Sequence, residues 1–415
     1  MEPEKYKRFE FSYGIILLRT RRFQSLMDRL GSSRISRPIG WFLLYVMPVA
    51  AAIGFYLFIS ELGVLLSPRG AAVASYVRTL GPLANLGLPG INPYLPIVDG
   101  WIALVVAMII HEGAHGVVAR SLGLPVKAAG LLFFLFVPIG AFVDVDENAM
   151  KETRSSYSGR VLAAGAGINL VAGLLCLLVL VASVGAFQPA ASGAGIVGVG
   201  SGTPAGTAGI MPGDIITQFN GKNVTDLGSV LGPNTTLKAG QSVNLTVFRN
   251  GQTLQFNNIK VACCYVVENL QTKQNTTFPY IGVSQISGPG LKSLVSGYAA
   301  PLSNPWQYVC IPTLPACQSR VPFSDAMGIF YTSPLGSVGV PFVNLVYWLF
   351  FLNFNLAIFN ALPIYPLDGG QAFLVGVKAL GRGKLSDRTL MRITAAATLV
   401  VVAMILGVVV SPYLF

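Results

Sequence analysis

The segment Val98–Val118 reads VDGWIALVVAMIIHEGAHGVV, and it combines the length of a membrane helix with a cluster of ionisable residues. A helix that crosses the hydrocarbon core of a bilayer needs about 20 mostly apolar residues. The polar residues gather at His111–His115, inside the apolar run. Placing an ionisable group at that depth in a membrane costs at least a few kcal/mol of free energy, and such groups rarely lack a function. We therefore expect a membrane helix that carries a functional site.

The composition of the whole chain agrees with that interpretation. Of its 415 residues, 53% are hydrophobic and 11% are charged, and the mean hydropathy is +0.62. Soluble domains carry about 25% charged residues, so an ordinary soluble enzyme is excluded, as is a disordered chain. Four further segments are apolar and long enough to span a membrane: Trp41–Leu66, Val161–Phe187, Val338–Leu362 and Ile393–Leu414.

A sixth apolar segment, Ala128–Val143, is short and is broken by Pro138 and Gly140. We expect it to form a β-hairpin at membrane depth, which is tolerated only where protein covers the backbone polar groups. The fold class expected is a polytopic α-helical membrane protein with about five to six membrane segments, one embedded β-hairpin and an additional α+β domain outside the membrane.

The distribution of basic residues predicts how the chain crosses the membrane. The formal net charge is +11, and the first forty residues hold nine Lys and Arg side chains. Such residues collect on the cytoplasmic side of membrane helices. We therefore expect a cytoplasmic N-terminal segment, residues 1–38, in a multi-pass protein of the cell membrane, with residues 188–337 outside. Nucleic-acid binding is disfavoured because no dense basic run has interleaved aromatic residues.

The two histidines of the chain, His111 and His115, indicate a metal site. Residues four apart lie on the same face of a helix, so both imidazoles can reach one Zn²⁺. Glu112 between them can accept a proton from the attacking water. Zinc needs a third protein ligand, and without another histidine the candidates are carboxylates: Glu61, Asp144, Asp146, Glu147 and Asp368.

Among these carboxylates, Asp368 is favoured by its expected depth. It follows the apolar segment Val338–Leu362, beyond Pro363 and Pro366, which end a helix, and it precedes two glycines that permit a tight turn. With alternating spans, this places Asp368 at the depth of His111. A turn or helix-cap role for Asp368 is the alternative.

These two motifs together resemble those of the site-2 protease family of intramembrane zinc metalloproteases. The first is the H-E-x-x-H sequence that begins at His111, and the second is N-x-x-P-x-x-x-x-D-G, which begins at Asn360. The resemblance implies a zinc-dependent endopeptidase that cleaves membrane-spanning substrate proteins in regulated intramembrane proteolysis, with Asp368 as the third zinc ligand. It also implies that the hairpin pairs with an unwound substrate.

The resemblance further suggests two substrate-binding residues, Asn169 and Asn360. Asn169 ends the glycine-rich stretch Gly165-Ala166-Gly167-Ile168-Asn169, where it could hold the substrate strand or the oxyanion. A hydrogen bond between helices is an equally open role for this side chain.

Residues 193–285 differ in character and resemble a PDZ domain. A helix is expected near Leu227–Leu231, and strands at Val243–Arg249 and Thr253–Val261 are joined by Asn250-Gly251, a strong hairpin signal. PDZ domains bind an extended peptide, such as a substrate C-terminus, at a sheet edge. The groove would be framed by residues 195–198 or by residues 280–283.

The expected organisation is thus residues 1–38, a first membrane region at 39–187, the PDZ-like domain, an ordered linker at 286–337 and a second membrane region at 338–415. Cys310 and Cys317 in the linker form the favoured disulfide pair, which residence outside the cell permits. Two other functions stay open. A transporter predicts inverted repeats, which the chain does not show, and a membrane-anchored PDZ receptor without catalysis would tolerate loss of His111, Glu112 and His115.

Overall fold

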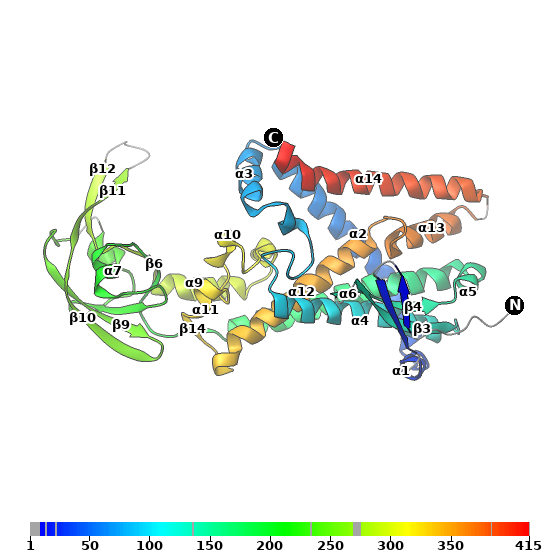
Figure 1. The fold of residues 1–415 in the computed structure, drawn as a ribbon, viewed down its shortest axis with the longest axis horizontal. Coiled ribbons are helices and arrows are strands. Elements are labelled where there is room, and N and C mark those ends of the chain that lie inside the picture. The colour runs from blue at the N-terminus through cyan, green and yellow to red at the C-terminus, as the bar shows by residue number, and fades with distance from the viewer. Residues whose placement is uncertain are drawn as a thin grey trace. The chain divides into compact units, whose positions relative to one another are not determined.

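The computed structural model describes residues 9–12, 15–20, 23–134, 137–232, 235–268, 275–382 and 384–414. The chain forms two compact units. Unit 1 comprises residues 1–177 and 347–415, and unit 2 comprises residues 178–346. Figure 1 shows the chain coloured from its N-terminus to its C-terminus, with many of its elements labelled.

Five helices in the described part of the chain are long and apolar enough to cross a membrane. These spans are α2 (Ser36–Leu65), α4 (Ile97–Ser121), α6 (Ser155–Gly185), the segment Gly336–Ala361 with α12 (Gly339–Ala361), and α14 (Asp387–Leu414). They coincide with the five apolar segments expected from the sequence, and several begin a few residues earlier. The prediction of five spans is therefore confirmed, whereas their orientation in the membrane stays a prediction.

Small residues allow the membrane helices of unit 1 to pack closely. One buried cluster brings together Ala50 of α2, Ala163 and Ala166 of α6, and Ala357 and Ala361 of α12. Side chains of this size let helix backbones approach one another, which is how helices associate where lipid offers no hydrophobic driving force. The shorter helices of this unit are α1 (Gln24–Gly31), α3 (Gly70–Leu80), η1 (Pro82–Asn85), α5 (Glu147–Glu152) and α13 (Asp368–Leu380).

Unit 1 also contains a four-stranded antiparallel sheet in the order β1-β2-β3-β4. Its strands are β1 (Phe9–Ser12), β2 (Ile15–Thr20), β3 (Val126–Phe134) and β4 (Val137–Val145). The last two strands occupy the segment for which the sequence predicts a hairpin, and their connection at residues 135–136 lies outside the described residues. Its depth in the membrane stays a prediction.

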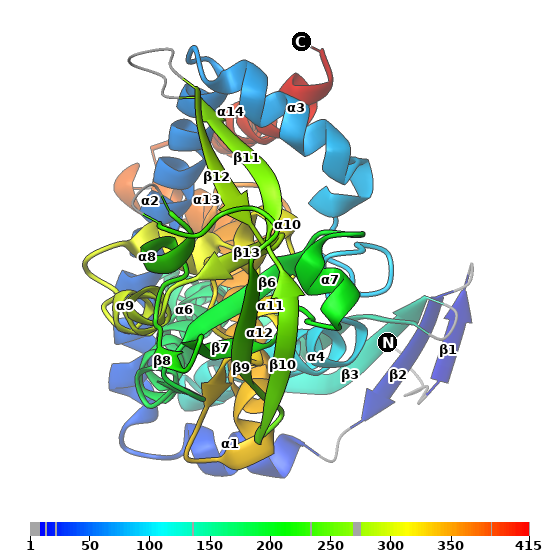
Figure 2. The same cartoon turned by 90° about the vertical axis from the view of Figure 1, so that its left-hand side faces the viewer.

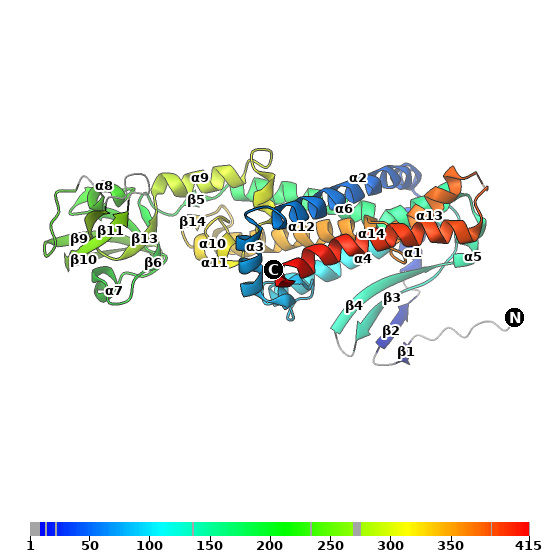
Figure 3. The same cartoon turned by 90° about the horizontal axis from the view of Figure 1, so that it is seen from above.

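The sequence did not predict that the basic N-terminal segment supplies half of this sheet. The strand β2, with the sequence IILLRT, pairs with β3 along its whole length. It thereby satisfies backbone groups that would otherwise be exposed at a sheet edge. Within the described residues β4 is an edge strand of this sheet (Figure 3), and it contacts α4.

Unit 2 is built around a sheet whose main path runs β10-β9-β7-β6-β13 (Figure 2). The strands are β6 (Ala194–Val199), β7 (Ile215–Phe219), β9 (Ser242–Arg249), β10 (Gln252–Lys260) and β13 (Val283–Ile286), with β8 (Lys222–Asn223) paired to β7. Two short helices, α7 (Pro204–Ala208) and α8 (Gly228–Leu231), accompany the sheet, and β11 (Ala262–Glu268) pairs with β12 (Asn275–Tyr280).

The predicted turn between β9 and β10 is present. Asn250 and Gly251 both have positive φ, 49° and 83°, as a two-residue hairpin turn of this kind requires. Nearby, the buried carboxylate of Asp214 accepts hydrogen bonds from Arg249 Nε at 2.6 Å and from Nη2 at 2.8 Å. This hydrogen-bonded ion pair raises the pKa of Arg249 above its usual value. The pair fixes β9 to the loop that precedes β7.

The segment expected to be a linker is a packed part of unit 2. It contains α9 (Gly288–Tyr298), η2 (Pro305–Val309), α10 (Pro315–Gln318), α11 (Asp325–Gly328), η3 (Gly336–Val338) and β14 (Tyr331–Thr332), which pairs with β5 (Gln188–Pro189). The ring of Tyr298 is buried against the rings of Tyr308 and Phe323. The predicted disulfide between Cys310 and Cys317 is present. Aromatic side chains and a covalent link therefore give this segment a core of its own.

Candidate active site

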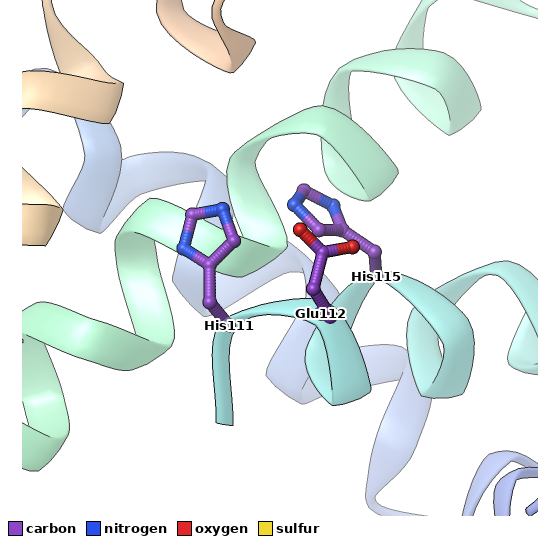
Figure 4. A group of neighbouring side chains, drawn as sticks. All are labelled: His111, Glu112 and His115. Carbon is purple, nitrogen blue, oxygen red and sulfur yellow. The ribbon is translucent and has the colours of Figure 1, made fainter. Parts of the chain in front are cut away.

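The helix α4 carries the three polar residues of the H-E-x-x-H motif on one side. Figure 4 shows both imidazoles and the carboxylate of Glu112 projecting from this side of the helix. One ligand atom of each of these three residues lies within 4.8 Å of the others. His111 and His115 are buried, with 6% and 8% of their surface exposed. The helical spacing of four residues therefore brings the two rings together, as the sequence predicts.

Asp368 reaches the same place from the first residue of α13. Its Oδ2 atom lies 3.0 Å from His111 Nε2 and 3.0 Å from His115 Nε2. The backbone turns tightly just before and after Asp368. A Cβ atom at Gly369 or Gly370 would come within 3.0 Å of the backbone of the preceding turn. The glycines that follow Asp368 are thus required by the backbone of this turn.

The arrangement fits a zinc ion. Two imidazole nitrogens and one carboxylate oxygen are the donor set of a catalytic zinc site that keeps a fourth position for water or substrate. Zinc–ligand bonds of about 2.0–2.1 Å would place tetrahedral ligands roughly 3.3 Å apart, close to the observed 3.0 Å separations. A Cβ atom at Gly165 would lie 2.5 Å from His111 Nε2 and closer still to His115 Nε2. Glycine at this position therefore leaves free space beside both nitrogens.

Residues of helix α6 lie beside the Nδ1 atoms of the two imidazoles, on the side away from Asp368. His115 Nδ1 lies 2.7 Å from the carbonyl oxygen of Val161, and it can donate to this oxygen as Nδ1–H. That tautomer leaves the lone pair on Nε2 toward Asp368. The amide nitrogen of Asn169 lies 3.4 Å from His111 Nδ1. Neither Val161 nor Gly165 could be identified as a site residue from the sequence. Val161 acts through its backbone carbonyl group, and Gly165 acts through the absence of a Cβ atom.

The carboxylate of Glu112 faces the edge strand β4. Its Oε2 atom accepts a hydrogen bond of 2.9 Å from the backbone N–H of Val143. A cavity of about 600 Å³ reaches Glu112, His115 and Asp368, and its lining also includes charged residues at Glu147, Lys151 and Lys378. The cavity is therefore large enough to hold water beside these side chains.

Two of the alternative carboxylate ligands are engaged elsewhere. Asp146 accepts a hydrogen bond from the N–H of Ala149 at the start of α5, which lowers the pKa of Asp146, and it pairs with Lys127 at 3.1 Å. Glu147 pairs with Lys151. The structure thus brings only Asp368 among the five candidate carboxylates within 3.0 Å of both histidines in the described residues.

The second candidate for substrate binding, Asn360, lies near the end of α12. Its amide nitrogen donates to the carbonyl oxygen of Leu356 in the same helix, at 3.1 Å. Its role in binding substrate stays a prediction.

Comparisons with known proteins agree with this site. Residues 100–407 match peptidase family M50. An uncharacterized protein of Methanocaldococcus jannaschii is 25% identical over 360 residues, which are 86% of this chain and 77% of its own. A candidate zinc metalloprotease of Mesorhizobium japonicum is 25% identical over 73% of this chain and 94% of its own. The zinc metalloprotease RasP of Shouchella clausii is 25% identical over 53% of this chain and 50% of its own.

Proposed function

Because the chain belongs to peptidase family M50 and is a zinc-dependent metalloendopeptidase of the membrane, we propose that it cleaves membrane-spanning proteins within or beside the bilayer. The observation that carries this proposal is the convergence of His111, His115 and Asp368 at 3.0 Å, from helices α4 and α13. In this role the enzyme would act in regulated intramembrane proteolysis, on substrates that themselves cross the membrane.

His111, His115 and Asp368 hold the zinc ion in this proposal, and Glu112 is the general base. Bound zinc supplies Lewis acidity, which activates water and polarises the scissile carbonyl group. Glu112 takes the proton of the attacking water and returns it to the leaving amine. The N–H of Val143 orients the Glu112 carboxylate toward the cavity. Burial of both histidines excludes bulk water from the far sides of their rings.

The edge strand β4 is where we place the substrate. A helical peptide bond is shielded by its own hydrogen bonds, so the substrate must unwind and then satisfy its backbone groups in another way. Adding it as a strand to a sheet edge satisfies them. The strand β3 is paired with β2 on one side and with β4 on the other, so β4 forms one edge of this sheet in the described residues. At this edge the N–H of Val143 already binds Glu112, so the substrate would pair with the neighbouring backbone groups of β4.

Unit 2 would hold a peptide end of the substrate in a PDZ-like groove. The strand β13 ends the sheet, whereas β6 is paired on both sides, which favours residues 280–283 over residues 195–198. A cavity of about 440 Å³ lies there, and its lining includes Leu227, Leu231, Ile281 and Val283. Gly282 has a φ of 85°, so this loop turns its backbone in a way that favours glycine.

Basic residues and the disulfide support the proposed orientation. Lys and Arg side chains are dense in the first forty residues, which supports a cytoplasmic N-terminus. The Cys310–Cys317 disulfide suits an oxidising compartment, which supports the proposed location of unit 2 outside the cytoplasm. A peptide-binding receptor without catalysis is disfavoured, because the chain belongs to a peptidase family and groups two histidines and a glutamate on a long apolar helix.

Removal of the metal tests the proposal. We expect a zinc chelator such as 1,10-phenanthroline to abolish cleavage of a membrane-spanning substrate by the purified protein in liposomes, and added zinc to restore it. Cleavage would be followed on gels as the appearance of two fragments. A non-chelating phenanthroline isomer serves as the control. Undiminished cleavage after the zinc has been removed, as measured by elemental analysis, would contradict a metal-dependent mechanism.

A further inference from the structure

Asn169 has an unusual environment for an asparagine in a membrane helix. It lies in α6, and none of its surface is exposed. Its amide nitrogen lies 3.4 Å from Nδ1 of His111, while its amide oxygen has no hydrogen-bond partner among the described residues. Leaving a buried acceptor without a partner destabilises the folded protein, so the position of this oxygen calls for an explanation.

The tautomer that His111 needs as a zinc ligand explains the position of this amide. Its Nε2 atom faces Asp368 Oδ2 at 3.0 Å, so Nε2 must present a lone pair if this ring is to bind zinc. The proton of the neutral ring is then on Nδ1, where it needs an acceptor. The two ends of an asparagine amide have nearly the same shape, and exchanging them places the oxygen beside Nδ1–H. The exchange gives a partner both to the orphaned oxygen and to the imidazole N–H.

We propose that Asn169 accepts the Nδ1–H of His111 and is a positioning residue for the zinc site. It would fix the tautomer and the ring plane of His111, as outer-shell acceptors commonly do for metal-binding histidines. This inference rests on the zinc site proposed above and adds to it the residue that orients one ligand.

The neighbouring ligand is held in the same way, from the same helix. His115 Nδ1 lies 2.7 Å from the carbonyl oxygen of Val161. Val161, Gly165 and Asn169 follow one another at intervals of four residues, so they lie on one face of α6. This face provides one backbone acceptor, one gap for the two rings and one side-chain acceptor. Asn169 thus does for His111 what a carbonyl group does for His115.

The geometry separates this role from the substrate contact that the family resemblance suggests. The nitrogen of His111 that approaches Asn169 is Nδ1, whereas the nitrogen that approaches Asp368 is Nε2, on the other side of the ring. Asn169 is fully buried, and it does not line the 600 Å³ cavity that reaches Glu112 and Asp368. Its amide therefore acts through the imidazole and not on the substrate.

Zinc affinity of the full-length protein tests the proposal directly. We expect Asn169→Leu, which keeps the volume and removes the acceptor, to weaken zinc binding about 10- to 100-fold in competition with a chelator. Asn169→Asp keeps an acceptor of the same size and should retain affinity within a few-fold of the wild type. With cobalt in place of zinc, the visible absorption bands should change in Asn169→Leu and be preserved in Asn169→Asp.

A matched control is Asn355→Leu, because the amide of Asn355 donates to the carbonyl of Phe351 within its own helix. This variant should bind zinc as the wild type does. The proposal is overturned if Asn169→Leu binds zinc with wild-type affinity and an unchanged cobalt spectrum, or if Asn169→Asp loses affinity as severely as Asn169→Leu. His111→Ala distinguishes a failure of the role given to Asn169 from a failure of the proposed zinc site. If His111→Ala also leaves zinc affinity unchanged, the zinc site itself is wrong.

Discussion

Glu112→Gln is expected to lower the rate of substrate cleavage by roughly 10²- to 10⁴-fold while the protein keeps its zinc. Glutamine has the same shape as glutamate and can still accept the hydrogen bond from Val143 N–H, which is 2.9 Å long in the wild type. It cannot take up a proton from water. The loss should therefore appear in the catalytic rate and not in metal content, and it would be measured with a membrane-spanning substrate in liposomes.

The neighbouring carboxylate at Glu147 provides the control for this experiment. Glu147 lines the same cavity and pairs with Lys151, away from the two histidines. Glu147→Gln removes the same charge and should cleave at a rate close to that of the wild type. If Glu112→Gln cleaved as fast as Glu147→Gln, the general base would have to be another group.

Gly165→Ala is expected to impair both zinc binding and cleavage, although it adds only one methyl group. That group would lie 2.5 Å from His111 Nε2 and closer still to His115 Nε2, the two nitrogens that face Asp368. Relieving such a clash costs about 1–3 kcal/mol, which corresponds to roughly 10- to 100-fold weaker zinc binding. Displaced ligands should slow catalysis further, by about 10²-fold for a shift near 1 Å.

Gly159→Ala on the same helix separates this effect from a general change in α6. A Cβ atom at Gly159 would make an ordinary contact of 3.5 Å with Leu44, so this variant should bind zinc and cleave substrate normally. Both properties would be measured on the purified variants, zinc affinity by competition with a chelator. Wild-type zinc affinity in Gly165→Ala would mean that the imidazoles do not lie against α6 as described.

The sequence predicted those features that depend on local patterns. Runs of about 20 apolar residues located all five spans, because crossing a bilayer requires that length. The Asn250-Gly251 pair located a hairpin turn, because both residues adopt positive φ easily. The spacing of His111 and His115 predicted that their rings meet, and the expected depth of Asp368 predicted its proximity to them.

Features that depend on contacts between distant segments could not be predicted in this way. The pairing of β2 with β3 joins residues 15–20 to residues 129–134, and a short apolar strand such as β2 does not specify its partner. The importance of Gly165 arises from the rings of another helix, and the acceptor role of Val161 resides in its backbone. The choice between the two proposed positions of the groove in unit 2 rests on the strand order, in which β13 and not β6 is at the edge.

Zinc content and coordination of the purified protein test the central claim most directly. We predict one zinc per chain, with an X-ray absorption spectrum of nitrogen and oxygen ligands at about 2.0–2.1 Å. Asp368→Ala should lose zinc during dialysis against a chelator under conditions where the wild type retains it. Asp387→Ala, which removes the first residue of α14, should behave as the wild type does. Full zinc retention and an unchanged spectrum in Asp368→Ala would contradict the claim that these two histidines and this aspartate bind one ion.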